Sequence, residues 1–324
     1  MLVFMIAKLF QLYRVAPFWL RNLIGHLTWP LRLLMQCASR GISLGSYQMS
    51  LDFTDNASFK YYADRDQYEA AEIRLFLSCV IANPEACVID IGANYGAYTL
   101  AAANLTRFGV PLKIIAIEPD HRPFAALRRS IKRNGFGPVV ELHQAIATDH
   151  SGQESLYLNA RSSADNRSVA VTSAPINVRS TATVACTSID HLLLEAGAPD
   201  HSRFIIKMDI QGNEPRALKG MLRTLRQAGG FILFFEHCRY LIDSAKCDMS
   251  EYRRTLQELA ADEYYKISPV DGVLRLNGLE GLFASFETLE SQRETKMQGA
   301  AADYILCRNL QTSSLRALCG GSRR

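Results

Sequence analysis

An acidic residue stands where an apolar segment passes into a glycine-rich turn. The segment Val88–Gly96 contains Asp90, and its glycines allow a tight turn and a close approach of the backbone to a ligand. The glycine pattern of dinucleotide-binding proteins is not met, because Asn94 and Ala97 occupy its second and third glycine positions. A carboxylate here would repel a pyrophosphate, whereas it suits a ligand with ammonium and sulfonium charges. The segment therefore predicts a site for S-adenosyl-L-methionine.

A second acidic residue follows the next apolar segment. Glu118 comes directly after Leu112–Ile117 and lies 22 residues beyond Gly96, a spacing at which an acidic side chain accepts hydrogen bonds from ribose hydroxyls. One carboxylate can accept two such bonds, and both are charge-assisted. Small and apolar residues after the third predicted strand are placed to flank an adenine ring. The residues that these patterns predict to bind the cofactor are Asp90, Gly92, Ala93, Asn94, Gly96, Glu118, Ala145 and Ile146.

Charged residues also gather at the ends of two later apolar segments. Within Phe204–Glu214, the alternation of a strand puts Lys207 and Asp209 on one face. The following strand ends in an acid and a histidine, and neighbouring parallel strands end at the same edge of a sheet. We therefore predict that five residues converge on one pocket as catalytic groups: Lys207, Asp209, Glu214, Glu236 and His237.

These residue types fit methyl transfer to a hydroxyl group. The reaction needs a nucleophile held in line with the methyl carbon, and it benefits from a base that removes the hydroxyl proton. The base would be Asp209, Glu236, His237, or Lys207 if burial lowers its pKa. Two other interpretations stay open: Lys207 pairs with Asp209 or Glu236 to hold the strand ends together, or Asp209, Glu214 and Glu236 bind magnesium or calcium. Our prediction includes no metal.

Short apolar segments alternate with helical patterns from residue 70 onward. Apolar strands separated by helices indicate a mostly parallel sheet covered on both faces. We predict an α/β fold with a doubly wound, mostly parallel seven-stranded sheet of the Rossmann-like kind, whose last strand is antiparallel. The polar stretch 151–187 predicts a β-rich excursion or a long loop near the substrate site. The strands are predicted at Cys87–Ile91, Leu112–Ile117, Val139–His143, Phe204–Asp209, Phe231–Glu236, Tyr264–Ser268 and Tyr304–Cys307, and the helices at 97–108, 122–134, 214–228 and 249–262.

Composition limits the compartment and the partners. The chain has 324 residues, of which 48% are hydrophobic, and eight cysteines without a Cys-x-x-Cys pair. This pattern predicts free thiols in a reducing compartment, the cytoplasm. Residues 1–51 carry a charge of +5 and residues 308–324 carry +4, which leaves the middle acidic. A dedicated nucleic-acid binder has a basic stripe instead, so we predict no nucleic-acid partner.

The N-terminal segment is basic and amphipathic. On a helical wheel, the polar residues of 1–36 fall within one arc, and Pro17 and Pro30 interrupt the helix. Such a segment either lies on the inner face of a membrane as a peripheral contact, or packs on its own domain or on a second subunit. The longest stretch of this segment without a charged residue is too short to span a bilayer. We predict a basic amphipathic helical extension over 1–50, a methyltransferase domain over 51–308 and a basic flexible tail over 309–324.

Taken together, these motifs resemble the FkbM family of methyltransferases over about Tyr68–Arg308. The resemblance rests on the pair Tyr68-Glu69, on Val88–Gly96, Ile117–Pro119 and Thr187–Asp190, and on the Lys-x-Asp-x-x-Gly-x-Glu pattern of Ile206–Glu214. It implies the class I methyltransferase fold, S-adenosyl-L-methionine as cofactor with contacts from Tyr68 and Glu69, and O-methylation of hydroxyls on natural products or surface glycans. The family usually has Glu where this chain has Gln211, so any role of that Glu is lost or altered here.

Three functions fit the sequence. The first is an O-methyltransferase acting on a glycan or a small natural product. The second is a protein or nucleic-acid methyltransferase, which the acidic middle disfavours; the lack of an Asn-Pro-Pro-Tyr or Asp-Pro-Pro-Tyr sequence after the fourth strand speaks against adenine methylation. The third is a non-catalytic module that binds the cofactor or a partner through the same fold.

Overall fold

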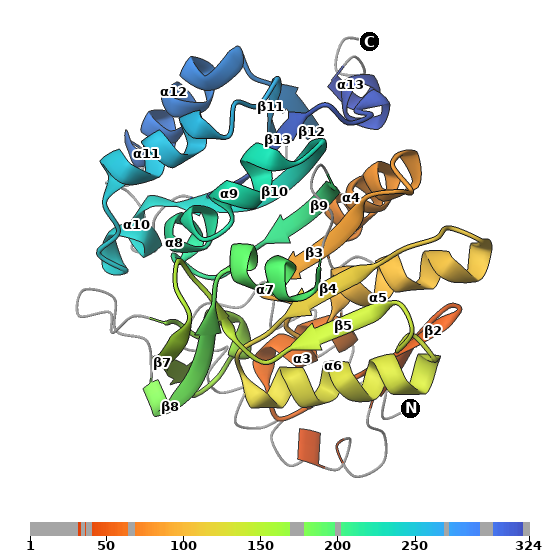
Figure 1. Cartoon of the computed structure of the whole chain (residues 1–324). Coiled ribbons are helices and arrows are strands. Elements are labelled where there is room, and N and C mark those ends of the chain that lie inside the picture. Colours follow the sequence, from red (N-terminus) through yellow and green to blue (C-terminus); the bar gives the residue numbers. More distant parts are fainter. Residues whose placement is uncertain are drawn as a thin grey trace.

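An eight-stranded sheet forms the centre of the molecule (Figure 1). The computed structural model describes residues 32, 33, 36, 41–63, 69–168, 178–197, 202–268, 272–291 and 301–319. The strand order is β12-β11-β13-β10-β9-β3-β4-β5. Strands β10, β9, β3, β4 and β5 are parallel, and β13 lies antiparallel between β10 and β11. The bounds are β3 Cys87–Ile91, β4 Ile114–Ile117, β5 Val140–His143, β9 Arg203–Met208, β10 Gly230–Cys238, β11 Glu263–Ser268, β12 Gly272–Arg275 and β13 Ala301–Arg308.

The prediction of a doubly wound, mostly parallel sheet with an antiparallel last strand is confirmed. All seven predicted strands are present within a few residues of their expected bounds. The eighth strand, β12, was not predicted. It pairs antiparallel with β11 at the edge of the sheet, and its four residues include only two apolar side chains, too few to give a recognisable alternation.

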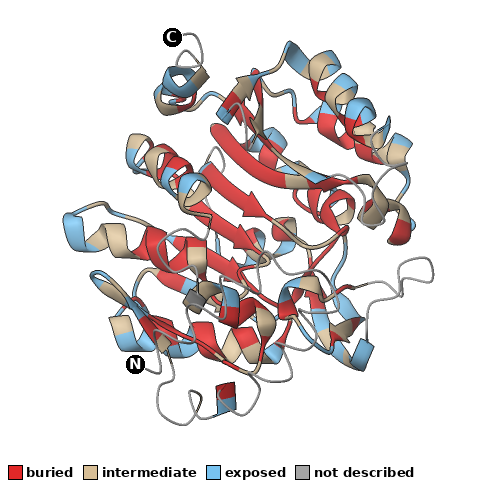
Figure 2. Ribbon diagram, turned by 180° about the vertical axis from the view of Figure 1, so that it is seen from behind, coloured by how far each residue is buried: buried red, intermediate tan, exposed pale blue. Residues whose placement is uncertain are grey.

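Helices cover both faces of the sheet. One core cluster joins β-sheet residues to α4, α5 and α6, and the other joins the opposite face to α7, α8, α9, α11 and α12. The strands between the two layers are buried along most of their length (Figure 2). The bounds are α3 Asn56–Ala63, α4 Ala70–Ala82, α5 Ala97–Asn104, α6 His121–Asn134, α7 Ile189–Glu195, α8 Glu214–Lys219, α9 Leu222–Gln227, α10 Arg239–Ser244, α11 Met249–Glu258 and α12 Gly278–Ser291.

The strand order reverses between β3 and β9. From β3 the chain passes to β4 and β5 on one side, and later strands build the other side from β9. Helices on the two faces diverge at such a point, which leaves a crevice at the carboxyl ends of the strands. Asp90 precedes the end of β3, and Asp209 follows β9 directly. The residues predicted to do chemistry therefore come from the strands on either side of this crevice.

A separate three-stranded sheet extends from the domain. Its order is β6-β8-β7, with β6 Ile146–Ala147, β7 Gly152–Asn159 and β8 Val178–Thr187. The prediction of a β-rich excursion over 151–187 is confirmed. After β7 the chain passes through a short 3-10 helix, η2 Ser163–Asp165. We call residues 159–168 the cover segment, for the position over the pockets described below.

The two ends of the chain differ from their predictions. Residues 41–50 form a hairpin of β1 Gly41–Leu44 and β2 Tyr47–Ser50, whose Ser50 N–H donates to Ser130 Oγ of α6. A helical extension is therefore wrong for residues 41–50. The flexible tail is wrong for residues 313–319, which form α13 Ser313–Cys319 with Leu315 fully buried.

Part of the predicted amphipathic segment contacts its own domain. Arg32 is buried and donates from Nε to the carbonyl of Phe53 at 2.6 Å. Gln36 accepts from the Phe53 N–H at 2.8 Å. Residues 1–31 lie outside the described residues. In the part of the chain that the structure describes, no helix is long and apolar enough to cross a bilayer, and the seven cysteines are free thiols, as predicted.

Candidate functional site

Two adjoining pockets open at the carboxyl ends of β3, β4 and β9. The Glu118 pocket has an empty volume of about 540 Å³ and is lined by Glu118, Pro119, Ala145 and Ile146, among others. The Lys207 pocket has an empty volume of about 460 Å³, and its lining includes Glu69, Asp90, Tyr98 and Lys207. Both volumes include open solvent. The pockets share the lining residues Gly92, Asn94, Ala164 and Asp209.

Glu118 is held by two backbone N–H groups at the end of β4. Its Oε2 accepts from the N–H of Asn94, and its Oε1 accepts from the N–H of Asp120, both at 2.8 Å. A carboxylate has about four lone-pair sites, so two remain for a ligand in the pocket. Burial raises the pKa of Glu118 to about 8. A ligand that donates hydroxyl hydrogen bonds would favour the charged form.

Asp90 is fastened to the first turn of α5. Its Oδ2 accepts from both the N–H and the hydroxyl of Thr99, at 3.0 and 2.5 Å. Burial raises the pKa of Asp90 to about 6, although Thr99 and the charge of Lys207 act in the opposite direction. Asp90 thus closes the helix end with one oxygen and lines the Lys207 pocket. This placement combines a helix-capping role with a position in the lining of the pocket.

The glycines of the first turn are required by packing within the protein. A Cβ on Gly92, whose φ is +82°, would lie 2.1 Å from the backbone oxygen of Asp209. A Cβ on Gly96, at φ +90°, would lie 2.3 Å from Leu127 Cδ1 of α6. Gly92 lines both pockets, whereas Gly96 lines neither. Both glycines were predicted to allow a tight turn and a close approach to a ligand; the positive φ of both fits the turn, and Gly96 lies against Leu127 of α6 rather than in a pocket lining.

The cover segment lies over the turn that follows β3. Asp55, at the start of α3, accepts from the N–H and the hydroxyl of Ser163, at 3.0 and 2.5 Å, and from the Tyr95 hydroxyl at 2.9 Å. Asn166 donates to Asp120 Oδ2 at 2.8 Å. Ser163 and Asn166 line the Glu118 pocket. Sequence reasoning missed Asp55, Ser163 and Asn166, because polar residues in an irregular segment carry no periodic signal.

Lys207 is the cationic centre of an acidic cluster. Its Nζ lies 3.6 Å from Asp303 and 3.8 Å from Asp209, and 5.4 Å from the centre of the Tyr98 ring. Burial lowers the pKa of Lys207, but the neighbouring acids outweigh it and the net shift is upward. The neighbouring acids therefore favour the protonated form of Lys207, which speaks against the alternative that burial lowers its pKa and makes it a base. Tyr98 hydrogen-bonds to Glu69 in the same pocket.

Two further carboxylates stand beside this cluster. Glu236 on β10 is paired in register with Asp303 on β13, and burial together with neighbouring acids raises the pKa of Glu236 well above its ordinary value. One oxygen each of Asp209, Glu214 and Glu236 lie within 4.8 Å of one another. Sequence reasoning missed Asp303. The only sign of a role in the sequence is that Asp303 is acidic and lies on the same face of β13 as the apolar Ile305.

Glu214 holds a loop rather than lining a pocket. Its Oε1 accepts from the N–H of Ile210 at 2.9 Å, and its Oε2 accepts from the N–H of Gly212 at 2.8 Å. It is almost fully buried, and burial raises its pKa to about 7. Glu214 thus fixes the loop that follows Asp209. The neighbouring Gln211 donates to Asp209 Oδ1 at 3.0 Å and lines the Glu118 pocket.

His237 lies on the opposite face of the sheet, so the prediction that it joins the catalytic pocket is wrong. Its ring stacks on Phe286 at 3.7 Å between ring centres and lies parallel to Tyr252 at 5.9 Å. Burial lowers the pKa of His237 to about 3. Consecutive strand residues point to opposite faces, so Glu236 faces the acidic cluster and His237 the aromatic core.

The predicted residues therefore separate into three groups. Most of them meet around the two pockets, either in their lining or in the carboxylate cluster, and Ala93 is in this group. Gly96 and His237 pack elsewhere, and Tyr68 lies outside the described residues. Glu214 belongs to the carboxylate cluster, but its carboxylate is already bonded to the loop that follows Asp209. The arrangement offers hydrogen-bond acceptors at one end and a cation among acids at the other.

Comparisons with solved structures give distant likenesses. Precorrin-8w decarboxylase of Methanobacterium thermoautotrophicum is 12% identical, with 72% of this chain and 89% of that chain covered and a TM-score of 0.36. Precorrin-6y C5,15-methyltransferase of Geobacter metallireducens is 11% identical over 73% and 88%, with a TM-score of 0.34. A protein of Burkholderia thailandensis bound to S-adenosyl-homocysteine is 12% identical over 76% and 78%, with a TM-score of 0.35. TM-scores this low carry no argument about function.

Sequence comparison is more specific. No curated protein matches the chain. A family model, the methyltransferase FkbM domain, matches residues 90–263, more than half of the chain. The match begins at Asp90 and includes Glu118, Lys207, Asp209 and Glu236, the residues gathered around the two pockets. The chain belongs to the FkbM family of methyltransferases.

Proposed function

We propose that the protein is an S-adenosyl-L-methionine-dependent O-methyltransferase that acts on a hydroxyl of a glycan or a small natural product. The observation that carries this proposal is the adjacency of the two pockets. One presents a carboxylate with unused lone pairs, and the other presents Lys207 and Asp209 side by side. The two pockets share lining residues, so one bound molecule can extend from the first into the second.

The residues present fit the cofactor. In the Glu118 pocket, the carboxylate of Glu118 would accept from the ribose hydroxyls, and Ala145 and Ile146 would flank the adenine. In the Lys207 pocket, Asp90 would face the ammonium group, and Asn94 lies where the two pockets meet. When bound, the cofactor supplies a methyl carbon on a sulfonium, which is the electrophile of the reaction.

The acceptor side supplies a base and a fixed cation. Asp209 lines both pockets and is 38% exposed, so it can receive the proton of an acceptor hydroxyl. The cofactor would supply the methyl group to the hydroxyl oxygen and would keep the carbon–sulfur bonding pair on its sulfur. Lys207 stays charged and orients Asp209 and Asp303 through its two ion pairs. Removal of the hydroxyl proton by a positioned base is worth roughly 10²–10⁴-fold in rate.

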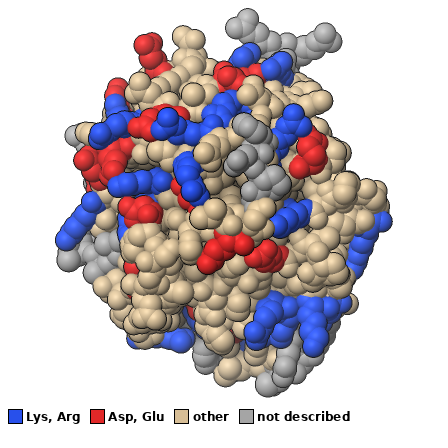
Figure 3. Space-filling view, in the orientation of Figure 1, with Lys and Arg blue, Asp and Glu red and all other residues tan. Residues whose placement is uncertain are grey.

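The lining of the pockets supports a hydroxylated, uncharged acceptor. Tyr61 and Tyr98 offer aromatic surface in the Lys207 pocket, and Glu69 offers a further hydrogen-bond acceptor. Acidic side chains outnumber basic ones in both linings, which disfavours a phosphate backbone. Figure 3 shows basic side chains gathered over α6. The exposed basic residues of this helix include Arg128, Arg129, Lys132 and Arg133, and none of these four lines either pocket.

Release of S-adenosyl-homocysteine tests this function. The wild-type protein is incubated with S-adenosyl-L-methionine and a panel of oligosaccharides, lipid-linked sugars, polyketides, peptides and RNA. We expect turnover with a hydroxylated member, and a fall in kcat of about 10²-fold or more in Asp209→Asn with the cofactor affinity kept. Asp243→Asn is the matched control, because Asp243 also pairs with a cation, Arg239, at similar exposure.

Two results would contradict the proposal. Methylation of RNA or of a peptide nitrogen, with none of any hydroxyl, would replace the acceptor class. Binding of the cofactor without turnover of any acceptor, in both wild type and control, would favour a non-catalytic binding module.

A further inference from the structure

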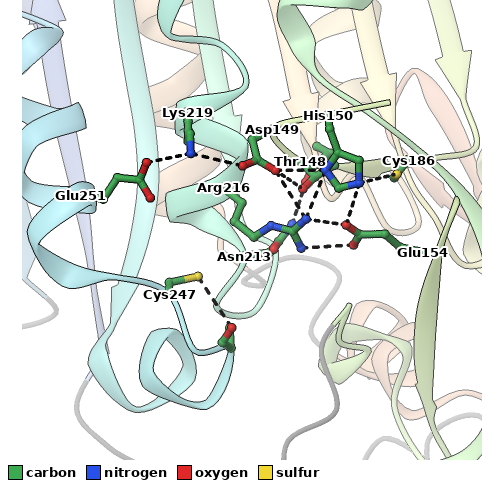
Figure 4. Close-up of polar contacts among 12 residues, drawn as sticks. Thr148, Asp149, His150, Glu154, Cys186, Asn213, Arg216, Lys219, Cys247 and Glu251 are labelled. Carbon is green, nitrogen blue, oxygen red and sulfur yellow. Dashed lines mark hydrogen bonds and ion pairs between the residues drawn. The ribbon is translucent and has the colours of Figure 1, made fainter. Parts of the chain in front are cut away.

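A second cluster of reactive side chains lies on the three-stranded sheet. His150 follows β6, Glu154 lies on β7 and Cys186 lies on β8, and one ligand atom from each lies within 4.8 Å of the others. His150 Nε2 is 3.6 Å from Cys186 Sγ and 3.4 Å from Glu154 Oε1 (Figure 4). None of the three residues lines the Glu118 pocket or the Lys207 pocket.

These separations match those of atoms bound to one tetrahedral ion. Zinc lies about 2.3 Å from a thiolate sulfur and about 2.0–2.1 Å from an imidazole nitrogen or a carboxylate oxygen. At tetrahedral angles, such bonds place sulfur and nitrogen about 3.5 Å apart, and nitrogen and oxygen about 3.3 Å apart. We propose that His150, Glu154 and Cys186 form a binding site for a divalent transition-metal ion of the zinc type. A set of sulfur, nitrogen and oxygen ligands excludes magnesium and calcium, which prefer oxygen alone.

Asp149 supplies the partner that a metal-binding histidine needs. Its Oδ1 lies 3.1 Å from Nδ1 of His150. A carboxylate in this position accepts a hydrogen bond from Nδ1–H, which keeps the ring proton on Nδ1 and leaves the lone pair of Nε2 free for an ion. Asp149 is itself held by Arg216 at 3.5 Å and by Lys219 at 3.6 Å (Figure 4). Arg216 Nη2 also lies 3.4 Å from Nδ1 of His150. The orientation of the ring is therefore set by neighbours that do not bind the ion.

Arg216 shares one of the ligands. Its guanidinium reaches Glu154 Oε1 at 2.5 Å and Oε2 at 3.2 Å. When Oε1 binds the ion, Oε2 remains available to Arg216. Cys186 must lose its thiol proton on binding, so the affinity rises with pH. Three protein ligands leave one position of a tetrahedral ion for water, and His150, with its side chain 49% exposed, gives solvent a route to it.

The ion would join three segments that position the cover segment. One ligand comes from the turn that follows β6, one from β7 and one from β8. Strand β7 leads directly into residues 159–168. Ser163, Ala164 and Asn166 of the cover segment line the Glu118 pocket. Metal binding is therefore expected to stabilise the three-stranded sheet and, through it, the wall of that pocket.

Titration with zinc and with cobalt tests the site on the full chain, after treatment with a chelator. We expect one zinc ion per chain by calorimetry, and a cobalt spectrum with tetrahedral and thiolate-to-metal bands. Cys186→Ser and His150→Ala are expected to weaken zinc binding by at least about 100-fold, and Asp149→Asn by about 10–100-fold. Cys247→Ser and His191→Ala are the controls, because they change a thiol and a Glu-paired histidine outside the cluster.

The readout requires no methyl transfer, so it stands apart from the proposed function. Circular dichroism checks that each variant is folded, and His150→Ala at a half-exposed position serves if Cys186→Ser does not fold. The proposal fails if the wild type binds less than one zinc per chain. It also fails if both ligand variants bind as the wild type does, or if the cobalt complex lacks the thiolate band.

Discussion

Replacing Lys207 with methionine removes the cation from the acidic cluster while keeping the length of the side chain. Lys207 is only 7% exposed, whereas the side chains of Asp209 and Asp303 are 38% and 41% exposed. Breaking a fully buried ion pair costs about 3–5 kcal/mol, and an exposed pair contributes about 0–1 kcal/mol. Because Lys207 is buried and its two partners are half-exposed, we expect an intermediate cost. Lys207→Met should lower the free energy of unfolding by about 2 kcal/mol at neutral pH.

The loss should depend on pH in a defined direction. Burial raises the pKa of Asp303 and of Glu236, and Lys207 counteracts both shifts. Without the cation, the folded-state pKa values of these carboxyls rise further above the unfolded values of about 4. A carboxyl of this kind holds its proton more tightly in the folded state than in the unfolded state. Stability therefore falls as pH rises from the unfolded pKa toward the folded pKa. The wild type keeps the contribution of Lys207 throughout, because the raised pKa of Lys207 means that this contribution is lost only at alkaline pH.

Urea unfolding followed by circular dichroism, at pH 4.5 and at pH 7.5, measures the difference. We expect Lys207→Met to be close to the wild type at the lower pH and clearly less stable at the higher one. Arg226→Met is the control, because Arg226 pairs with Glu258 on the exposed surface and should change stability little at either pH. Equal destabilisation at both values, or none at either, would refute the account of Lys207 as the charge that holds the cluster.

Three other substitutions test separate parts of the structure. Gly92→Ala should lower the free energy of unfolding by at least about 2 kcal/mol, because the added Cβ meets the Asp209 backbone, and calorimetry should show weaker cofactor binding. The control Gly109→Ala has a similar φ of +85° and no neighbour within 4 Å, and it should cost about 1 kcal/mol. His237→Phe should keep methyl transfer within twofold and leave stability equal or higher by up to about 1 kcal/mol, since neither ring nitrogen has a hydrogen-bond partner among the described residues; a large loss of kcat would restore His237 to the site. Glu214→Gln should lower the melting temperature, because an amide nitrogen would face one backbone N–H, at a cost of about 1–3 kcal/mol, and an unchanged melting temperature would contradict that role.

The residues at strand ends were the most predictable part of the site. A nearly continuous apolar run fixes the position of a buried parallel strand, and the residue after it must lie at the open edge of the sheet. Asp90, Glu118 and Asp209 can therefore be placed at the same crevice from the sequence alone. The prediction failed for His237, because a strand that continues by one more residue turns the next side chain to the other face.

Contacts between distant segments were not predictable. Asp55 reaches Ser163 over 108 positions, and neither residue belongs to a periodic pattern. The burial of α13 also depends on tertiary contacts: Arg316 bonds Glu263 from β11, and Leu315 enters the core. A short helix with two arginines after it has the composition of a flexible tail until the surface on which it packs is known.

The central claim is that Glu118 holds S-adenosyl-L-methionine at the end of β4. Calorimetric titration of the wild type, of Glu118→Gln and of Glu141→Gln, an acid exposed on β5, tests it most directly. The account predicts micromolar binding by the wild type and by Glu141→Gln, and at least about 10-fold weaker binding by Glu118→Gln, as expected for a lost hydrogen bond to a charged group. No binding by the wild type, or equal affinity in Glu118→Gln once its fold is verified, would contradict it.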